Sequence, residues 1–451
     1  MYQLPQELIE SLKDVKGFDE EAFKQVHNAR ETITSLRINP DKITDIPQTL
    51  PGEKIPWSPY GCYLSERPSF TLDPMLHAGA YYVQEAGSQF LWEVLKQIFK
   101  TNKEATVADL CAAPGGKSTL LASYFTDGCV VANEVIKSRC AILEENITKW
   151  GAANTIVTNN DPKDFSRLPG FFDALVIDAP CSGSGLFRKD NGAIEEWSIA
   201  NVELCSKRQQ RILHDAYDSL KNNGYLIYAT CSYSKEENED IIDYILQNFE
   251  TESVRVQIND SWNIIETNTG NKGYGYRFFP HKVKSEGFFI AVFKKKDGTH
   301  YTDTLKAKWE LASKKEMEEI ARWMQHTEDF QVIKNNDKLI AIRKQDVEKI
   351  SALKQNLYLK KAGIELGEIK NKGLVPAHNF ALSGLVSKSM PHIELTKEDA
   401  LNYLRKKDFA YNDNSTGWAL ATYNQIPIGW MKILPNRVNN YYPVEWRILK
   451  Q

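Results

Sequence analysis

Residues 106–118 have the sequence TVADLCAAPGGKS, in which a short apolar run passes directly into a glycine-rich loop. The run from Thr106 to Leu110 predicts a buried β-strand. Gly115 and Gly116 let the backbone turn sharply and approach a ligand closely. A helix that follows such a loop directs its free amide groups and the positive end of its dipole at a carboxylate or phosphate. The stretch therefore predicts a strand, a ligand-binding loop and a helix in succession.

The alternation of strands and helices continues to about residue 295. Further buried strands are predicted at 129–133, 155–158, 173–178, 225–229 and 287–293. Helical patterns are present at 90–98, 137–150, 199–222 and 235–248. Strands that alternate with helices, and that show no polar alternation, are typical of a mostly parallel sheet covered on both faces. The expected fold class is therefore α/β, a Rossmann-like sheet with helices on both faces.

Four regions are expected along the chain. Residues 1–100 mix helical patterns with proline-rich connections and predict a small N-terminal helical lead-in, and residues 101–296 predict the sheet domain. After residue 297 the pattern loses its strands and becomes mixed and charged, so that 297–370 is expected to be a linking region. Residues 371–451 are richer in aromatic and turn residues and predict a separate small C-terminal domain.

The loop after the first strand excludes two common nucleotide-binding motifs. An ATP-binding P-loop requires glycine at position 111, which is occupied by Cys111. The dinucleotide-binding pattern Gly-x-Gly-x-x-Gly is absent. A plain strand-to-helix turn without a ligand stays open on this loop alone.

Acidic residues at the ends of the next three predicted strands favour a nucleoside-shaped ligand. In a doubly wound sheet, ligands bind beyond the carboxyl ends of the strands. Glu134 ends the second strand and suits hydrogen bonds to ribose hydroxyls, Asp161 follows the third and can accept from an adenine amino group, and Asp178 ends the fourth. No phosphate-binding chemistry beyond the first loop is required, which suits S-adenosylmethionine.

Two of the seven cysteines follow predicted strands directly. The number of cysteines is odd and no Cys-x-x-Cys occurs, so we expect no disulfide framework, no zinc site and no other metal. Cys181 lies in the sequence DAPCSGSG (178–185) and Cys231 in YATCSY (228–233), after the fourth and fifth strands. A parallel sheet places both thiols at the cofactor edge. Buried thiols without a chemical role remain the alternative.

A thiol at this edge suits methylation of carbon-5 of cytosine. Carbon-5 is a poor nucleophile, but addition of a thiolate to carbon-6 makes it enamine-like, and it can then take a methyl group. The carbon-5 proton must then leave, with elimination of the thiol. The attacking cysteine needs an accessible thiolate near neutral pH, and Asp178 can hydrogen-bond the cytosine edge. Position at the strand ends does not decide which cysteine attacks.

Three motifs in order, at 109–117, 178–181 and 229–232, resemble those of the RNA 5-methylcytosine methyltransferases of the NOL/NOP/Sun group. Supporting stretches lie at 77–86 and 277–291. The resemblance covers about 1–295 and about 371–451, where the tail is similar to the RNA-binding region of bacterial RsmF-type enzymes, which modify 16S ribosomal RNA. Phe279 and Gly87 depart from the Trp and Ser that the family often has, and neither belongs to the proposed chemistry.

The resemblance implies a class I S-adenosylmethionine methyltransferase fold and a role for each motif residue. Cys231 would be the nucleophile, Cys181 would assist product release, and Lys117 would lie close to Asp178. S-Adenosyl-L-methionine would be held by Glu134 at the ribose, Asp161 at the adenine, Asp178 near the methyl donor and base, and the loop Cys111, Ala112, Ala113, Pro114, Gly115, Gly116 and Lys117.

RNA would be the partner, with 16S ribosomal RNA in the small subunit as the expected substrate. The tail would be a PUA-like RNA-binding domain, and the N-terminal region would also contact RNA. Binding of an unpaired base requires basic and aromatic surface. The candidates are Arg188 and Lys189, the group Lys360, Lys361, Lys370 and Lys372, and Trp430 with Arg437 and Arg447.

The bulk composition limits the other possibilities. The 451 residues carry a net charge of −3, so RNA would have to meet locally basic surface. No signal peptide and no apolar run of about 18 residues is evident, so a cytoplasmic location without a membrane partner is expected.

Three alternatives to methylation of 16S ribosomal RNA stay open. They are methylation of transfer RNA or another RNA, a DNA cytosine methyltransferase in which the cysteine after proline attacks, and a non-catalytic RNA-binding ribosome assembly factor. The second cysteine after Thr230 favours RNA over DNA, and the complete set of chemical residues favours an enzyme.

Overall fold

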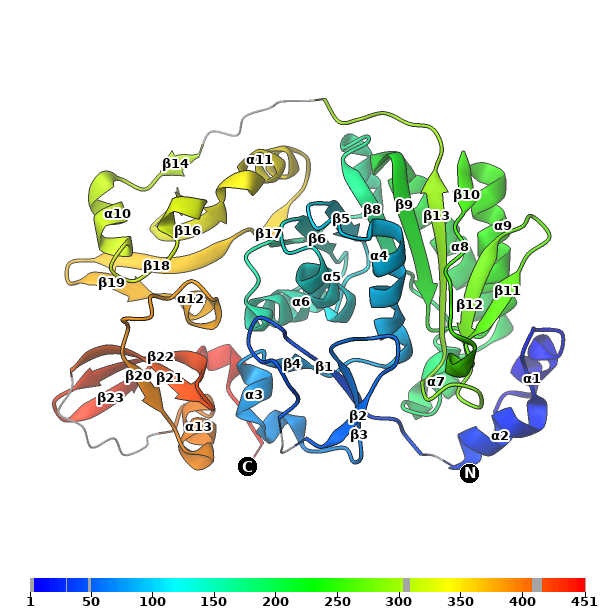
Figure 1. The fold of residues 1–451 in the computed structure, drawn as a ribbon, viewed down its shortest axis with the longest axis horizontal. Helices are drawn as coiled ribbons and strands as arrows, with labels where there is room; N and C mark the ends of the chain where they lie inside the picture. Colours follow the sequence, from blue (N-terminus) through cyan, green and yellow to red (C-terminus); the bar gives the residue numbers. More distant parts are fainter. Residues whose placement is uncertain (1–3, 30, 48–49, 303–308, 408–415, 451) are drawn as a thin grey trace.

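The computed structural model describes residues 4–29, 31–47, 50–302, 309–407 and 416–450. Within these ranges the chain forms four β-sheets with helices between them (Figure 1). The largest sheet lies at the centre, the N-terminal strands lie below it in the view of Figure 1, and the last third of the chain lies to one side.

The central sheet has ten strands in the order β11-β12-β13-β9-β8-β5-β6-β7-β17, and β10 pairs with β13. Its parallel part confirms the predicted α/β fold class. The parallel strands are β5 (Thr106–Asp109), β6 (Cys129–Asn133), β7 (Thr155–Thr158), β8 (Phe172–Asp178) and β9 (Leu220–Thr230). The predicted late strand is β13 (Phe288–Lys295), which runs antiparallel to β9. The sequence did not predict β10 (Thr251–Ser253), β11 (Ile265–Asn268) or β12 (Tyr274–Phe278).

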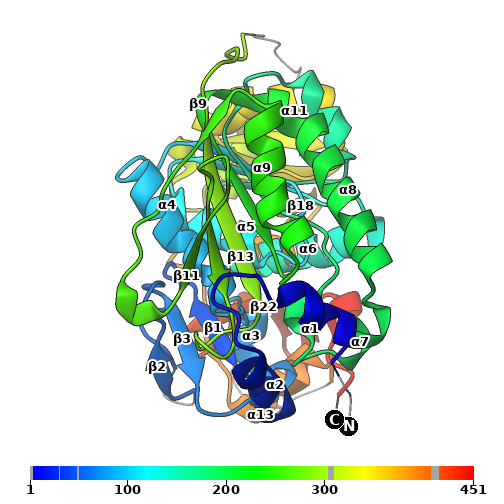
Figure 2. The ribbon, with the colours of Figure 1, turned by 90° about the vertical axis from the view of Figure 1, so that its right-hand side faces the viewer.

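Helices cover both faces of the central sheet, as Figure 2 shows for α8 and α9 on one face and α4 on the other. Neighbouring residues of β8 serve opposite faces. Leu175 packs in the same core as Ile212 and Ile241, while Val176 packs in the core that holds Leu91. The helices are α4 (Leu91–Phe99), α5 (Gly116–Tyr124), α6 (Lys137–Trp150), α7 (Asn191–Glu196), α8 (Ile199–Ala216) and α9 (Glu239–Asn248). Burial on both faces explains why these strands are apolar without alternation.

The N-terminal region contains the expected helices and, in addition, a four-stranded sheet that the sequence did not predict. The helices are α1 (Gln6–Leu12), α2 (Glu20–Ala29) and α3 (Pro74–His77), and the strands are β1 (Ser35–Ile38), β2 (Gly52–Lys54), β3 (Gly61–Leu64) and β4 (Tyr81–Tyr82), in the order β2-β3-β1-β4. Strands of two to four residues are too short to show a periodic pattern. Buried Arg37 joins this sheet to α5, because its Nη2 donates to Thr119 Oγ1 at 2.6 Å.

The region 297–370 was predicted to have lost its strands, and this prediction is wrong. It contributes to a five-stranded sheet in the order β14-β15-β16-β18-β19, together with helices α10 (Lys314–Ile320) and α11 (Val347–Asn356). The strands are β14 (Glu310–Leu311), β15 (Phe330–Asn335), β16 (Lys338–Arg343), β18 (Ile364–Lys370) and β19 (Gly373–Pro376), while β17 (Leu359–Lys361) pairs with β7 of the central sheet. Lysines at partly exposed positions of these strands make the sequence look charged rather than strand-like.

The C-terminal region forms a fourth sheet in the order β20-β21-β22-β23. Its elements are α12 (His378–Leu382), β20 (His392–Glu394), α13 (Lys397–Leu404), β21 (Gly417–Tyr423), β22 (Ile426–Leu434) and β23 (Arg437–Asn440). Ile428 and Met431 of this sheet share one hydrophobic core with Leu36 and Tyr81 of the N-terminal region. The N-terminal sheet region and the C-terminal region are therefore packed against each other. Among the helices in the described ranges, none combines the length and apolar character needed to cross a membrane.

Candidate active site

The carboxyl ends of the five parallel strands bring the predicted site residues to one edge of the sheet. The register pairs Asp178 with Ala229, Asp109 with Val176, and Asn133 with Thr158. Strand order reverses between β5 and β8, since β6 and β7 lie on one side of β5 and β8 and β9 lie on the other. Such a switch point leaves a crevice beyond the strand ends in which ligands bind.

The loop from Cys111 to Lys117 is held in place from the neighbouring helix α6. Arg139 donates to the carbonyl of Ala113 and Asn146 donates to that of Pro114, each at 2.8 Å. Gly115 has φ +115°, a left-handed conformation that favours glycine. Helix α5 begins at the next residue, so that its first amide groups face the crevice side of the loop.

Glu134 has the environment expected of a ribose-binding carboxylate. Its side chain is buried, and its Oε1 accepts from the backbone N–H of Ile136 at 2.9 Å. Its Oε2 is also buried, with Nη1 of Arg139 3.6 Å away but no hydrogen-bond partner within the described residues. A buried acceptor without a donor calls for a partner. The hydroxyls of a nucleoside fit this requirement.

Asp161 lies at the end of β7 and has a structural role as well. Its Oδ1 accepts from the backbone N–H of Lys163 at 3.2 Å and so caps the short 3₁₀ turn that begins at Pro162. Arg211 lies 3.6 Å from its Oδ2. The carboxylate is partly exposed at the crevice side, where it is able to accept a further hydrogen bond.

Lys117 and Asp178 form an ion pair at the centre of the edge, with Nζ and Oδ2 2.7 Å apart. The Lys117 side chain is 10% exposed and that of Asp178 is 36% exposed. Burial opposes the charge on Lys117, but the negative charge of Asp178 raises the pKa of the lysine overall. The predicted proximity of Lys117 and Asp178 is present in the structure.

The two cysteine thiols are in contact, with their Sγ atoms 3.0 Å apart. The backbone joins their loops as well, because Gly185 donates to the carbonyl of Cys231 at 2.8 Å. The contact with Cys231, together with burial, raises the pKa of the Cys181 thiol well above its ordinary value. Cys181 is therefore protonated near neutral pH, and a protonated thiol is a poor nucleophile.

Glu237 was not predicted as a site residue, yet it connects the two cysteine loops. Its buried carboxylate accepts from the N–H and Oγ of Ser182 at 2.8 and 2.6 Å and from Oγ of Ser232 at 2.5 Å. Gln209 donates to the same carboxylate at 3.3 Å and to the carbonyl of Pro180 at 3.0 Å. Each serine directly follows one of the cysteines, so this carboxylate fixes both loops.

Asp109, at the end of β5, was also not predicted as a site residue. It is fully buried, and its Oδ2 accepts from Ser118 Oγ at 2.6 Å. Burial raises the pKa of Asp109 to about 7. The residue ties the first turn of α5 to the strand that precedes the loop, and its position inside the motif at 109–117 was the available signal.

Three candidate RNA contacts are contradicted by their burial. Trp430 is fully buried and packs 5.8 Å from the ring centres of Trp323 and Phe380. The side chain of Arg188 is 3% exposed and lies 3.6 Å from Glu286. Lys361 is 8% exposed and cannot present an ammonium group on the outer surface. Aromatic and basic residue types do not reveal burial. The candidates that are exposed or partly exposed are Lys189, Lys360, Lys370, Lys372, Arg437 and Arg447.

Three family models match successive parts of the chain. Residues 96–294 match the model described as 16S rRNA methyltransferase RsmB/F. Residues 4–86 match the N-terminal domain of 16S rRNA methyltransferase RsmF, and residues 390–448 match the methyltransferase RsmF PUA domain.

Curated relatives cover most of the chain. The ribosomal RNA small subunit methyltransferase F of Vibrio atlanticus is 31% identical over 409 residues, which is 87% of this chain and 85% of that protein. The protein with the same name from Shewanella piezotolerans is 28% identical over 431 residues, which is 91% of this chain and 90% of that protein.

Solved structures share the fold of about 65% of the chain. A methyltransferase homologue from Pyrococcus horikoshii is 26% identical with a TM-score of 0.52, covering 65% of this chain and all of that one. NSun6 from the same organism is 20% identical with a TM-score of 0.53 over 65% of this chain and 98% of that one, and shows a shared fold. The matched domains follow each other as in RsmF, and the chain belongs to the 16S rRNA methyltransferase RsmB/F family.

Proposed function

We propose that this protein transfers a methyl group from S-adenosylmethionine to carbon-5 of a cytosine in RNA, with 16S ribosomal RNA as the substrate. The observation that carries the proposal is the contact between Cys181 and Cys231 beside the Lys117–Asp178 ion pair. A methyltransferase that acts on an amine or hydroxyl requires no thiol, whereas attack on a pyrimidine ring requires a nucleophile.

The crevice would hold the cofactor through the strand-end residues. Oε2 of Glu134, which has no hydrogen bond in the structure, would accept from a ribose hydroxyl, and Asp161 would accept from the adenine amino group. When bound, S-adenosylmethionine supplies an electrophilic methyl group. The loop at Gly115 lets the backbone approach it closely.

Cys231 would add as a thiolate to carbon-6 of the cytosine, with a new carbon–sulfur bond as the result. The ammonium of Lys117 contributes positive charge near that thiolate. Asp178 would hydrogen-bond the base edge and hold the proton needed at ring nitrogen 3. Carbon-5 would then take the methyl group, the methyl–sulfonium bond would break, and S-adenosylhomocysteine would leave. Loss of the carbon-5 proton to water, return of the nitrogen-3 proton to Asp178 and breakage of the bond between carbon-6 and sulfur would restore the aromatic ring and the Cys231 thiolate.

Cys181 would assist the release step. Its raised pKa keeps it protonated beside Cys231, which suits a group that does not attack but takes part in proton movement during elimination. The family resemblance supports the same division of roles.

Methyl transfer and its position are tested together in RNA. Labelled S-adenosylmethionine is incubated with the protein and with small-subunit ribosomal RNA, and bisulfite sequencing then maps 5-methylcytosine. The proposal predicts label in the RNA and a protected cytosine in 16S ribosomal RNA. Label without any protected cytosine would contradict carbon-5 chemistry, and protection in transfer RNA alone would contradict the substrate.

A further inference from the structure

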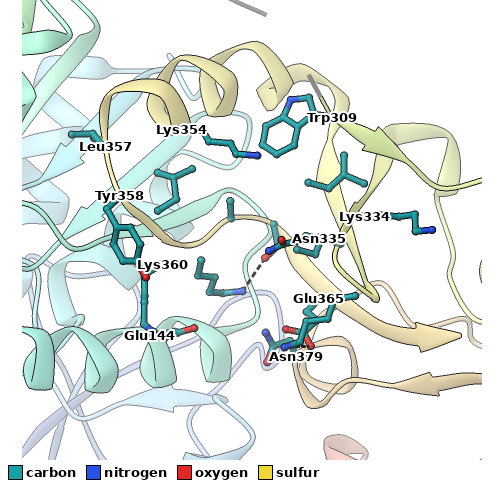
Figure 3. A pocket seen from close by; sticks show the side chains of 17 residues that line it. Glu144, Trp309, Lys334, Asn335, Lys354, Leu357, Tyr358, Lys360, Glu365 and Asn379 are labelled. Carbon is teal, nitrogen blue, oxygen red and sulfur yellow. Dashed lines mark hydrogen bonds and ion pairs between the residues drawn. The ribbon is translucent and has the colours of Figure 1, made fainter. Parts of the chain in front are cut away.

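A cavity of about 460 Å³ lies between the central sheet and the five-stranded sheet (Figure 3). Except for Glu144, its lining residues lie between Trp309 and Asn379, which none of the matching family models covers. Residues of β17 line it, and this strand pairs Leu359 with Thr158 of β7. Helix α6 contributes Glu144 from one side, and β15 and β16 contribute residues from the other. Its volume is in the range of pockets that hold small ligands, about 300–1,000 Å³.

The lining of this cavity is cationic. Five lysines face two glutamates, namely Lys334, Lys338, Lys354, Lys360 and Lys361 against Glu144 and Glu365. Each glutamate already has a lysine nearby, since Lys338 lies 2.9 Å from Glu365 and Lys360 lies 3.9 Å from Glu144. Lys334 is paired outside the lining, with its Nζ 3.3 Å from both Glu310 and Glu316. In the ranges that the structure describes, no carboxylate oxygen lies within 4.0 Å of Nζ of Lys354 or of Lys361.

Lys361 is the buried member of this group. Its side chain is directed to a backbone carbonyl, that of Gly363, to which Nζ donates at 2.9 Å. Burial lowers the pKa of Lys361 to about 8, so the ammonium form is penalised in the folded protein. The negative charges of Glu144 and Glu365 in the lining partly offset this penalty. Lys361 therefore adds positive charge inside the cavity and is not itself a surface contact for RNA.

Aromatic rings accompany the lysines. Figure 3 shows Trp309 beside Lys354, whose Nζ lies 4.1 Å from the centre of the Trp309 ring. Tyr358 is 63% exposed, and its backbone is fixed to the end of β7, because Asn160 both donates to and accepts from it. The next residue after Asn160 is Asp161. The cavity rim is thus attached to the loop that carries the adenine-side carboxylate.

We propose that this cavity binds the sugar-phosphate backbone of a single-stranded stretch of the RNA substrate, outside the methylated nucleotide, with one base stacked on Tyr358. Basic grooves with exposed aromatic rings bind single strands in this way. The inference rests on the proposed function in one respect, that RNA is the substrate.

The test measures binding of a fluorescent single-stranded RNA of mixed sequence to the full-length protein at several salt concentrations. Lys354→Ala and Tyr358→Ala each alter an exposed side chain of the cavity. The double variant is expected to weaken binding about tenfold. The slope of log affinity against log salt should fall by about 0.7, the value for one phosphate contact on a single strand. Lys349→Ala, on the same helix α11 but outside the cavity, is the matched control and should bind as the unaltered protein does.

Unchanged affinity and salt slope in the double variant, with the unaltered protein binding RNA, would overturn the inference. A second result would also overturn it. If binding of inorganic phosphate or cytidine monophosphate depends on Lys354 and binding of RNA does not, the cavity binds a small phosphate compound. The methyl-transfer assay tests the proposed function separately. Loss of methylation chemistry with intact dependence of RNA binding on Lys354 would reject that function and leave the cavity assignment standing.

Discussion

Glu237 shows how one buried carboxylate controls the geometry of the thiol pair. Burial raises the pKa of Glu237, and the hydrogen bonds from Ser182 and Ser232 oppose that rise. Hydrogen bonds to a charged acceptor contribute about 1.5–3 kcal/mol each. The donors come from both cysteine loops, so the distance between Cys181 and Cys231 depends on this residue although it touches neither thiol.

Glu237→Gln should lower kcat for methyl transfer by about 10- to 100-fold, because an amide cannot accept from all of these donors and misplacements of this kind are costly in catalysis. The KM for S-adenosylmethionine should change little, since the Glu237 carboxylate bonds to Ser182, Ser232 and Gln209 and to none of the residues proposed to hold the cofactor. Glu236→Gln, at the exposed neighbouring position, is the matched control. Steady-state kinetics of both variants measure the split. A rise in the KM for S-adenosylmethionine in Glu237→Gln, with kcat unchanged, would show that Glu237 does not position the thiols.

Asp109 makes stability depend on pH. Its folded-state pKa of about 7 lies above the ordinary value for aspartate, so the folded chain holds a proton that the unfolded chain releases. Stability should therefore fall as pH rises from about 4 to 7. Asp109→Asn removes this contribution and keeps an acceptor for Ser118. Urea unfolding between pH 5 and 8 should show a smaller decline in the variant, and identical declines would contradict the buried carboxyl as the cause.

The loop before α5 depends on glycine at one position more than at the next. Gly115 has φ +115°, and a Cβ there would lie 3.3 Å from Leu143 Cδ1. A Cβ at Gly116 would make ordinary contacts, the nearest with Tyr82 at 3.4 Å. Gly115→Ala is expected to destabilise the protein by about 1–3 kcal/mol and to weaken S-adenosylmethionine binding. Gly116→Ala is the control and should have the smaller effect on both. Calorimetry measures S-adenosylmethionine binding, and urea unfolding measures stability. Larger effects in Gly116→Ala than in Gly115→Ala would contradict the conclusion that the loop depends on the left-handed conformation of Gly115.

The elements that the sequence predicted well are those buried on two faces. Thr155–Thr158 and Cys129–Asn133 are buried throughout and mostly apolar, because helices cover both sides of the central sheet. Several of the strands that were missed are partly exposed or very short. Phe330–Asn335 is only partly buried, and lysine and asparagine at its end hide it within a charged region. Tyr81–Tyr82 has only two residues and no period to detect.

The site was predictable where function depends on a strand end. Glu134, Asp178 and Cys231 follow strands directly, so a parallel sheet places them at one edge. Glu237 was not predictable, because its role comes from contact with Ser182, 55 positions away. The burial of Trp430 also arises from distant packing, against Trp323 of another sheet region.

At the scale of the whole molecule, the N-terminal sheet region and the C-terminal region share one hydrophobic core. Ile428 and Met431 near the C-terminus share a core with Leu36 and Tyr81 near the N-terminus. Removal of residues 371–451 would therefore expose apolar surface of the N-terminal region and is not a clean way to remove an RNA-binding part. We expect such a truncation to lower the melting temperature measured by calorimetry, and an unchanged value would show that the shared core contributes little.

Surface substitution is the cleaner test of the C-terminal region. Arg437 and Arg447 are exposed, so Arg437→Ala with Arg447→Ala should keep the fold. RNA affinity should fall about tenfold and become less salt-dependent, because each phosphate contact releases counter-ions. Affinity for S-adenosylmethionine should stay the same. Filter binding at two salt concentrations measures the first effect, and full RNA affinity would assign these arginines another purpose.

The central claim is that Cys231 attacks the base and Cys181 assists release, and a denaturing gel tests it most directly. Each single alanine variant, and the double variant, is incubated with small-subunit ribosomal RNA and S-adenosylmethionine. Removal of the releasing thiol lets attack proceed and stalls elimination, so Cys181→Ala should accumulate a slow-migrating protein–RNA band that depends on S-adenosylmethionine. Cys231→Ala and the double variant should show no such band and no methyl transfer. A band in Cys231→Ala that is absent in Cys181→Ala would reverse the roles, and full activity in both single variants would contradict thiol catalysis.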